Sequence, residues 1–331
     1  WPKEYGGRGA TLMEQVVFKE EMAKHGAPPA GASSGLMWVG PTLLTHGTEE
    51  QRKRFLPKIL SGEEVWCTLY SEPGAGSDLA SAKTQARADG DDFVVNGQKV
   101  WTSGAHAADW GVLLARTDPD APRKHRGLTY FMIDMRSPGI TVRPLRDITG
   151  RSEFNEVFFD DVRIPKHQIL GELHMGWYVT VGALEFERSG TGEGFAREQA
   201  IRELIEMARQ TQRGGQPLSK DPLIRQRLAQ SHIENTVAKY MGLRNLTHQL
   251  RGGRPGSEVV PFSLFAAEFA QRLQVLAMQI QGSYSQLVSG SKYAVEDGRW
   301  QHDFLWSRQN SIGAGTSEIK RNIIAERVLG L

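Results

Sequence analysis

The sequence predicts an α+β fold made of N-terminal helices, a middle antiparallel β-barrel domain and a C-terminal four-helix bundle. Three observations carry this prediction: amphipathic helical segments before residue 63, short regularly spaced strands from 64 to 168, and a 3.6-residue apolar period after 169. Strands without intervening helices favour a barrel, whereas long amphipathic helices favour a bundle. We therefore expect domains at residues 1–63, 64–168 and 169–331.

Two helices are expected in the first domain, at residues 11–25 and 48–60. Thr48 can cap the second helix, and Glu49 and Glu50 place negative charge in its first turn, where the helix dipole favours it. Phe55 and Ile59 then follow at helical spacing.

Short strands rich in β-branched and aromatic residues are expected in the middle domain. They are residues 65–69, 93–95, 99–101, 111–115, 128–133, 140–142 and 156–163. Between the second and third of these strands stands Asn96-Gly97, a pair that tolerates the positive φ angles of a type I′ turn. We therefore expect a two-residue β-hairpin at this point.

Apolar residues mark one face of each long helix in the last domain. The faces are Ile201, Leu204, Ile205 and Ala208; Ile233, Val237, Tyr240, Leu243, Leu246 and Leu250; and Phe262, Phe265, Ala266, Phe269, Leu273, Leu276, Ala277 and Ile280. A last helix is expected after Thr316-Ser317, with Ile319, Ile323 and Val328 facing inward. Glycine-rich turns at 214–217 and 252–256 separate the helices.

The composition of the chain argues against several classes of protein. A net charge of +2 over 331 residues argues against a dedicated nucleic-acid binder, and the basic loop at 122–127 is predicted to be merely solvated. The single cysteine, Cys67, excludes an internal disulfide and suits a reducing cytoplasm. The nine histidines show no metal-ligand spacing, and no apolar run approaches the roughly 20 residues that span a membrane.

Two motifs stand at the centre of the β segment, SEPGAGSD at 71–78 and NGQKVWTS at 96–103. The first is a glycine-rich loop whose backbone N–H groups can approach an anion, but it lacks the Gly-Lys-Ser/Thr ending of a nucleotide P-loop. Taken alone, this loop could hold phosphates or simply turn the chain.

The whole set of motifs resembles the acyl-CoA dehydrogenase family, over essentially the full chain. The two motifs above match its flavin-binding signature, and YGG at 5–7, FFDDVRIP at 158–165 and GTSEI at 315–319 follow its order. In that family YGG lies some way into the protein, so we expect an N-terminal piece to precede residue 1, and a targeting segment there stays open.

The resemblance implies that the chain binds FAD. The matching positions are Thr68, Tyr70, Ser71, Gly76, Ser77, Trp101, Thr102, Ser103, Gln279, Gly282, Thr316 and Glu318. Trp101 would lie against the isoalloxazine ring with Ser103 near flavin N5, and Gln279 would reach a partner subunit's cofactor. Two departures from the family pattern concern the contact with a partner subunit. Ser283 stands in place of a glycine, and the family's Arg-x-x-Phe-Gly motif is not recognisable near residues 210–216, where Arg213 is a poor match to its arginine.

The catalytic base also departs from the common pattern. The family usually has a glutamate before Gly-Thr that removes the α-proton of the acyl thioester, but here that residue is Ala314. A subset of the family carries its glutamate on the first bundle helix, followed by arginine, and Glu187-Arg188 matches that arrangement. We predict Glu187 as the base. The remaining substrate contacts implied by the resemblance are Ser77, Glu185, Arg188, Ala314 and Gly315.

The implied function is FAD-dependent desaturation of an acyl-CoA to a trans-2-enoyl-CoA, as in fatty acid β-oxidation. Electrons would pass to an electron-transfer flavoprotein, and the protein would form a homotetramer or a heterotetramer in the cytoplasm, without nucleic acid or membrane. Two alternatives stay open: a non-catalytic subunit of a heteromeric dehydrogenase, and a flavin monooxygenase or oxidase on the same scaffold. Glu187 argues against both, because neither needs an α-proton base.

Overall fold

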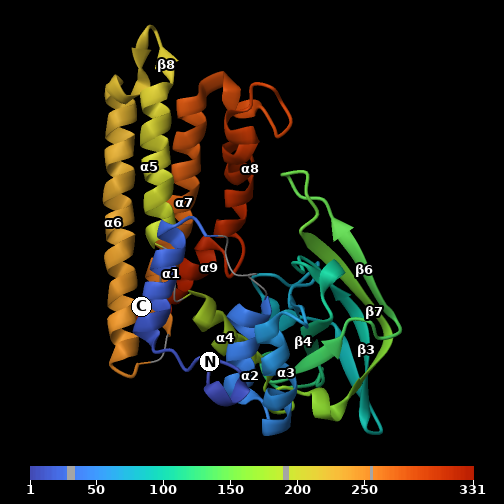
Figure 1. Cartoon of the computed structure of the whole chain (residues 1–331). Coiled ribbons are helices and arrows are strands. Elements are labelled where there is room, and N and C mark those ends of the chain that lie inside the picture. The colour runs from blue at the N-terminus through green and yellow to red at the C-terminus, as the bar shows by residue number, and fades with distance from the viewer. Residues whose placement is uncertain (28–33, 189–193, 254–255) are drawn as a thin grey trace. The chain divides into compact units, whose positions relative to one another are not determined.

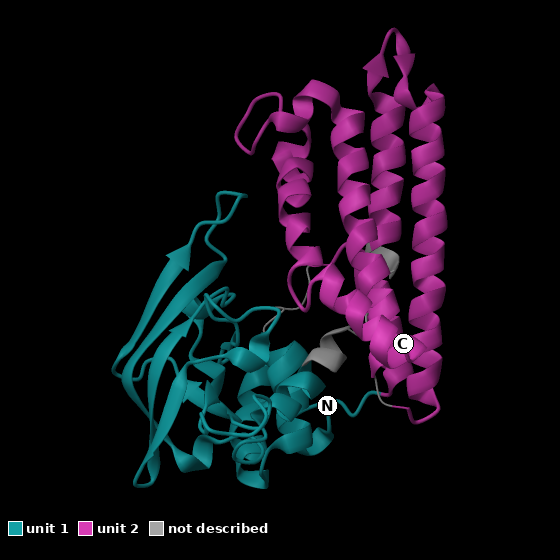
Figure 2. Ribbon diagram, turned by 180° about the vertical axis from the view of Figure 1, so that it is seen from behind, with its two compact units in different colours: residues 1–10, 29–187 teal, residues 11–28, 188–331 magenta. Residues whose placement is uncertain are grey.

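The computed structural model describes residues 1–27, 34–188, 194–253 and 256–331, and the chain forms two compact units (Figure 2). The first unit comprises Trp1–Ala10 and Pro29–Glu187. The second comprises Thr11–Pro28 and Arg188–Leu331, so the first long helix of the chain groups with the C-terminal bundle.

A twisted seven-stranded sheet forms the centre of the first unit within the described residues (Figure 1). Its strands are β1 (Trp66–Leu69), β2 (Gln85–Asp89), β3 (Asp92–Lys99), β4 (Trp110–Arg116), β5 (Leu128–Asp134), β6 (Ile140–Leu145) and β7 (Phe154–Pro165). The order is β1-β4-β2-β3-β7-β6, with β5 also paired to β4. Most pairs are antiparallel, as expected, but β1 and β2 run parallel to β4. Strand β2 was not predicted from the sequence.

The predicted hairpin at Asn96-Gly97 is wrong, because β3 continues straight through it with a bulge between Val95 and Gly97. The turn is made instead by Gly90-Asp91, which join the paired residues Asp89 and Asp92. Gly97 has a φ of 150°, and a Cβ atom there would lie 2.7 Å from Thr84 Oγ1. A glycine is therefore needed at this position because Thr84, just before β2, packs closely against β3, and not because the chain reverses there.

Helices cover one face of this sheet. They are the one-turn helix Lys3–Tyr5, α2 (Gly40–His46), α3 (Glu49–Ser61) and, at the end of the unit, α4 (Gly176–Arg188). Helix α3 begins as predicted, since Thr48 and Gln51 cap each other reciprocally. The sequence did not predict α2, which shares a core with α3 and β4 through Leu43, Leu56 and Val112.

The sheet is buried on both faces. Along β4, Val112 and Leu114 belong to the core beneath the helices, whereas Leu113 and Ala115 belong to a second core with residues of β3 and β7. This alternation follows from the two-residue period of a strand, and it explains why β4 reads as a continuous apolar run.

The second unit is a helical bundle. Its helices are α1 (Leu12–Lys24), α5 (Gly194–Gln210), α6 (Pro222–Leu250), α7 (Val260–Gln281), α8 (Arg299–Trp306) and α9 (Ser317–Ile323), and a small hairpin, β8 (Gln212–Arg213) with β9 (Gln216–Pro217), joins α5 to α6. Helices α5, α6 and α7 lie side by side (Figure 1). Their shared core contains Leu204, Leu228 and Phe269. No described helix is both long and apolar enough to cross a bilayer.

The apolar face that the sequence marks on α6 lies outside this core. Ile233, Val237, Tyr240, Leu243 and Leu250 are exposed, and only Leu246 of that set is buried. The helix turns a different line of residues toward its neighbours, namely Ile224, Leu228, Ser231, Asn235, Ala238, Asn245 and Leu246. Val328, predicted to face inward, is also exposed, because α9 ends at Ile323 and gives way to a wider π-type turn.

Candidate active site

The structure brings the two central motifs together in the first unit. The N–H of Val100 donates to the carbonyl of Ser71 at 2.9 Å, so the glycine-rich loop begins beside the segment that follows β3. Within the loop, Glu72 and Ala75 exchange two backbone hydrogen bonds of 3.0 Å. Gly76 and Ser77, which follow this tight turn, are exposed.

Trp101 is held in an unusual position. Its φ of 61° is in the left-handed region that large residues rarely adopt, and its side chain is 60% exposed. The ring has one aromatic neighbour in the described part of the chain, Phe154, at 5.9 Å in an edge-to-face arrangement. Strained backbone of this kind persists where surrounding contacts enforce it, and such positions concentrate at functional sites.

The contacts that enforce this conformation lie on β7. The N–H of Thr102 donates to the carbonyl of Asn155 at 3.1 Å, and the N–H of Asn155 donates back to the carbonyl of Thr102 at 3.0 Å. The Asn155 side-chain amide adds a third bond to the same Thr102 carbonyl. Trp101 is therefore presented outward from a segment that is itself fixed to the sheet.

These residues fit a bound flavin. The Thr102 Oγ1 atom is buried and, within the described residues, has no hydrogen-bond partner, although buried hydroxyls normally have one. Beside it stands the exposed indole of Trp101, a surface for a flat ring system. A flat group with polar edges would engage both, and the nearby hydroxyls of Ser71 and Ser103 offer further hydrogen bonds.

Thr68 and Tyr70 occupy neighbouring positions on and after β1. Thr68 is half-buried and lies opposite Val112 of β4. The Tyr70 hydroxyl is engaged by the protein, because it lies 2.5 Å from the hydroxyl of Tyr130. Burial and the neighbouring phenol of Tyr70 hold the pKa of Tyr130 well above its usual value, so the Tyr130 hydroxyl stays protonated.

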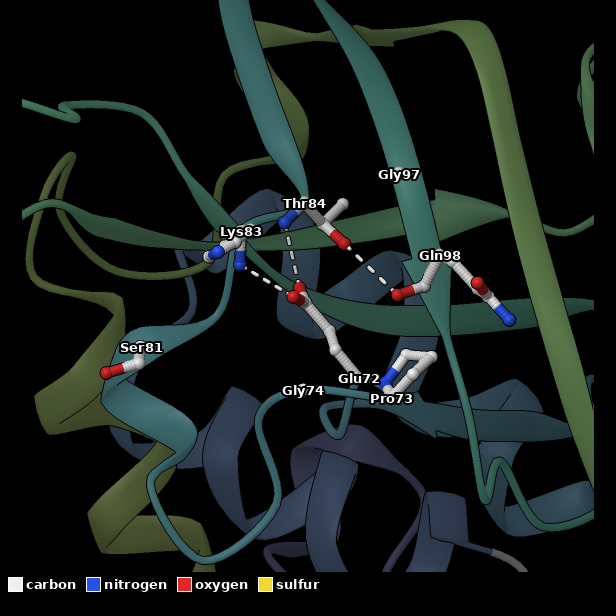
Figure 3. A pocket seen from close by; sticks show the side chains of 8 residues that line it. All are labelled: Glu72, Pro73, Gly74, Ser81, Lys83, Thr84, Gly97 and Gln98. Carbon is white, nitrogen blue, oxygen red and sulfur yellow. Dashed lines mark hydrogen bonds between the residues drawn. The ribbon is translucent and has the colours of Figure 1, made fainter.

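Two charged residues that the sequence interpretation missed lie under this loop. Glu72 and Lys99 form a buried ion pair with a 2.8 Å separation between Oε1 and Nζ. Glu72 also lines a pocket of about 220 Å³ together with Pro73, Gly74, Ser81, Lys83, Thr84, Gly97 and Gln98 (Figure 3). The available signal was a lysine two residues before Trp101, but the burial of Lys99 depends on the pairing of β3, which the wrongly predicted hairpin did not allow for.

In the second unit, the structure brings Gln279 and Gly282 together with Arg213. An Arg213 guanidinium N–H donates to the Gln279 carbonyl at 3.1 Å, and a Cβ atom on Gly282 would lie 3.5 Å from the same group. The Arg227 guanidinium contacts the Gln279 side-chain oxygen. Arg213 thus lies beside the predicted cofactor residue although the family's usual arginine motif is missing.

The segment before α9 combines a cap with a strained turn. Thr316 accepts a hydrogen bond from the N–H of Ile319 and caps the helix, and Glu318 lies exposed in its first turn. Ala314 and Gly315 are consecutive left-handed residues, with φ of 53° and 95°. A left-handed alanine costs on the order of 1–3 kcal/mol, so the surrounding turn must enforce this conformation.

The predicted base and its neighbours lie at the end of α4. Glu185, Glu187 and Arg188 are in its last turn, and their side chains are outside the described part of the structure. Their roles therefore stay predictions from the sequence.

Comparison with known proteins gives three family models in chain order. The acyl-CoA dehydrogenase N-terminal domain matches residues 1–63, the middle domain 67–162 and the C-terminal domain 174–329. A relative from Mycobacterium tuberculosis, named acyl-CoA dehydrogenase IpdE1, is 41% identical over 333 residues, covering 100% of this chain and 83% of the relative.

Two solved structures are similar in fold and sequence. One, titled Tcur3481-Tcur3483 steroid ACAD, has a TM-score of 0.90 at 32% identity and covers 100% of this chain and 84% of that chain. The other is the ChsE4-ChsE5 complex from Mycobacterium tuberculosis, with a TM-score of 0.88 at 34% identity, covering 100% of this chain and 85% of that chain.

Proposed function

The chain belongs to the acyl-CoA dehydrogenase family, and from this membership we propose that it uses FAD and Glu187 to desaturate a bulky acyl-CoA. It is an oxidoreductase of acyl-CoA thioesters and a member of a flavoprotein family. The observation that carries FAD binding is the outward Trp101 beside the buried hydroxyl of Thr102, which finds no hydrogen-bond partner among the described residues. Neither the silent-subunit nor the oxidase alternative is favoured.

FAD, when bound, supplies the acceptor for the hydride that leaves Cβ of the substrate. The chain's own residues do the rest. Glu187 takes the α-proton, because a carboxylate is a competent base and the methyl of Ala314 is not. The backbone N–H of Ala314 donates to the thioester oxygen, where negative charge grows as the α-proton leaves. That donor is independent of the side chain, so replacing the usual glutamate by alanine keeps it.

The FAD contacts proposed in the second unit are those of Gln279 and Thr316. The guanidinium groups of Arg213 and Arg227, which contact Gln279, support this role, because positive charge beside Gln279 favours binding of the cofactor diphosphate. We assign the Gln279 contact to the cofactor of a partner subunit. Electrons pass to an electron-transfer flavoprotein. The proposed compartment is the cytoplasm, because a chain with a single cysteine suits a reducing environment.

The proposed substrate class is a branched or polycyclic acyl-CoA processed by a β-oxidation-type sequence. Two facts support it: the solved structure that is 32% identical has steroid in its title, and Ala314 leaves more volume than the glutamate it replaces.

Anaerobic mixing with a panel of acyl-CoAs, from butyryl to branched and steroid side-chain thioesters, tests this substrate class. We expect loss of the flavin absorbance near 450 nm with the bulky thioesters. Reduction by straight short chains alone would contradict the substrate class. Absence of reduction by every thioester would favour a silent subunit, and rapid reoxidation by air with ligand bound would favour an oxidase.

We further propose a tetramer, either of one chain or of two related chains. The exposed apolar residues of α6, Ile233, Val237 and Tyr240, lie at helical spacing and form a continuous face of the kind that a partner covers. The name ChsE4-ChsE5 shows that one similar protein forms a complex of two chains.

If four copies of this chain assemble, light scattering of the FAD-loaded protein should give about four times the 36.8 kDa chain mass. If the tetramer contains two related chains, it should form only after the second chain is added. Tyr240→Asp should lower this mass, since it places a charge in the apolar face. The matched control is Ile148→Asp, which changes an equally exposed residue of the first unit. An active, FAD-loaded monomer would contradict the proposal.

A further inference from the structure

The buried ion pair beneath the glycine-rich loop is almost sealed from water. Lys99 has no exposed side-chain surface, and Glu72 is 8% exposed. The Lys99 Nζ donates to Glu72 Oε1 and to the Tyr70 carbonyl, both at 2.8 Å. Two backbone N–H groups, of Lys83 at 2.6 Å and Thr84 at 2.8 Å, also donate to the Glu72 carboxylate (Figure 3). The pair therefore joins three stretches of chain.

These three stretches include both halves of the proposed flavin site. Lys99 is the last residue of β3 and stands two residues before Trp101, whereas Tyr70 and Ser71 begin the glycine-rich loop. The Val100 N–H to Ser71 carbonyl bond runs beside the ion pair. A movement of Lys99 or Glu72 would thus change the position of residues 70–72 relative to 101–102.

Stability alone does not account for such a pair. Removing two charges from water costs about as much as their attraction returns, and a hydrophobic pair of similar volume is often equally stable. What a buried pair with directed hydrogen bonds supplies is one defined geometry. We propose that Glu72 and Lys99 are positioning residues that hold the glycine-rich loop in register with the Trp101-Thr102 segment and so preorganise the flavin site. This inference rests on the proposed FAD-dependent function.

The charges around Lys99 make this arrangement sensitive to pH. Burial lowers the pKa of Lys99 to about 8, against the opposing attraction of Glu72, and the positive charge of Arg116 on β4 lowers it further. Burial alone would raise the pKa of Glu72, but Lys99 and the backbone N–H of Lys83 outweigh it and leave the pKa below its usual value. Glu72 is therefore an anion at neutral pH and stays one as the pH rises, whereas Lys99 loses its charge as the pH passes about 8.

The test uses a double variant, Glu72→Gln with Lys99→Met. Glutamine keeps one acceptor oxygen for the N–H of Lys83 or of Thr84, which donate to different oxygens of Glu72, and methionine fills the volume of the lysine, so neither charge is left buried alone. Flavin is removed from wild type and variant, each apoprotein is titrated with FAD at pH 7, and its thermal midpoint is measured by circular dichroism. We expect the FAD dissociation constant to rise at least 30-fold while the apoprotein midpoint stays within a few degrees. The matched control, Asp89→Asn with Arg163→Met, removes the exposed ion pairs of Arg163 with Asp89 and Asp92 in the same sheet and should leave FAD affinity within threefold.

A second readout is the pH profile of FAD affinity between pH 6.5 and 9.5. We expect wild-type affinity to fall several-fold as the pH passes about 8, and the profile of the double variant to be flatter. Unchanged affinity in the double variant, a loss that tracks a lower apoprotein midpoint, or parallel pH profiles would each overturn the positioning role. Wild-type protein that binds no FAD would instead refute the proposed function.

Discussion

Replacing Glu187 by glutamine is expected to slow flavin reduction by an acyl-CoA by at least about 100-fold, the usual effect of losing a general base. The amide keeps the shape of the side chain but cannot take the α-proton, and Ala314 offers no alternative acceptor. FAD and acyl-CoA should still bind. The measurement is anaerobic stopped-flow absorbance with a thioester that reduces the wild-type protein.

The matched control for this change is Glu206→Gln. Glu206 is an exposed residue of α5 that pairs with Arg209, so the same chemical substitution there should leave the rate of flavin reduction unchanged. A Glu187→Gln protein that is reduced at the wild-type rate would show that another group removes the proton.

The second large effect is expected for Trp101→Ala, which should weaken FAD binding by about 100-fold. Removing a large aromatic contact costs on the order of 3 kcal/mol where the ring is covered by its partner, and each 1.4 kcal/mol is tenfold in affinity. Because the indole is 60% exposed without ligand, its loss should barely change the thermal midpoint of the apoprotein. Fluorescence titration of the apoprotein with FAD gives both dissociation constants.

Phe18→Ala is the matched control for the tryptophan variant. Phe18 lies on α1 in the second unit, is 61% exposed and is likewise aromatic, but it has no predicted cofactor role. We expect wild-type FAD affinity from it. Equal affinity in the Trp101→Ala protein would place the flavin elsewhere.

Much of this architecture follows from patterns that are local in the chain. The Thr48 cap, the apolar period of α7 and the short β-branched strands each depend on residues a few positions apart, so the order of helices, sheet and bundle was predictable. The motifs at 71–78 and 96–103 also predicted residues of the candidate site, because they match a family signature that can be read from the sequence alone.

The sequence predictions failed where the conformation of a residue depends on contacts with residues that are distant in the sequence. Asn96-Gly97 has the composition of a turn, yet Gly97 is required by the close approach of Thr84, the residue before β2, and the chain reverses at Gly90 instead. Helix α2 was missed because its few residues are stabilised by the core they share with α3 and β4. The face of α6 could not be assigned because an apolar stripe looks the same whether its partner is in the same chain or in another.

In the candidate site, too, some features follow from the sequence and others depend on the tertiary structure. Sequence alone predicted Trp101 and Thr102 as cofactor residues and the need for a base other than Ala314, since each prediction depends on which residue stands at a motif position. Three features depend on the pairing of β3 with β2 and β7 and on the loop that packs against the end of β3. They are the outward indole, the buried Glu72–Lys99 pair and the Thr102 hydroxyl, which has no hydrogen-bond partner in the part of the chain that the structure describes. Burial and hydrogen bonding are properties of neighbours in space, and strand pairing chooses those neighbours from parts of the chain that no local pattern connects.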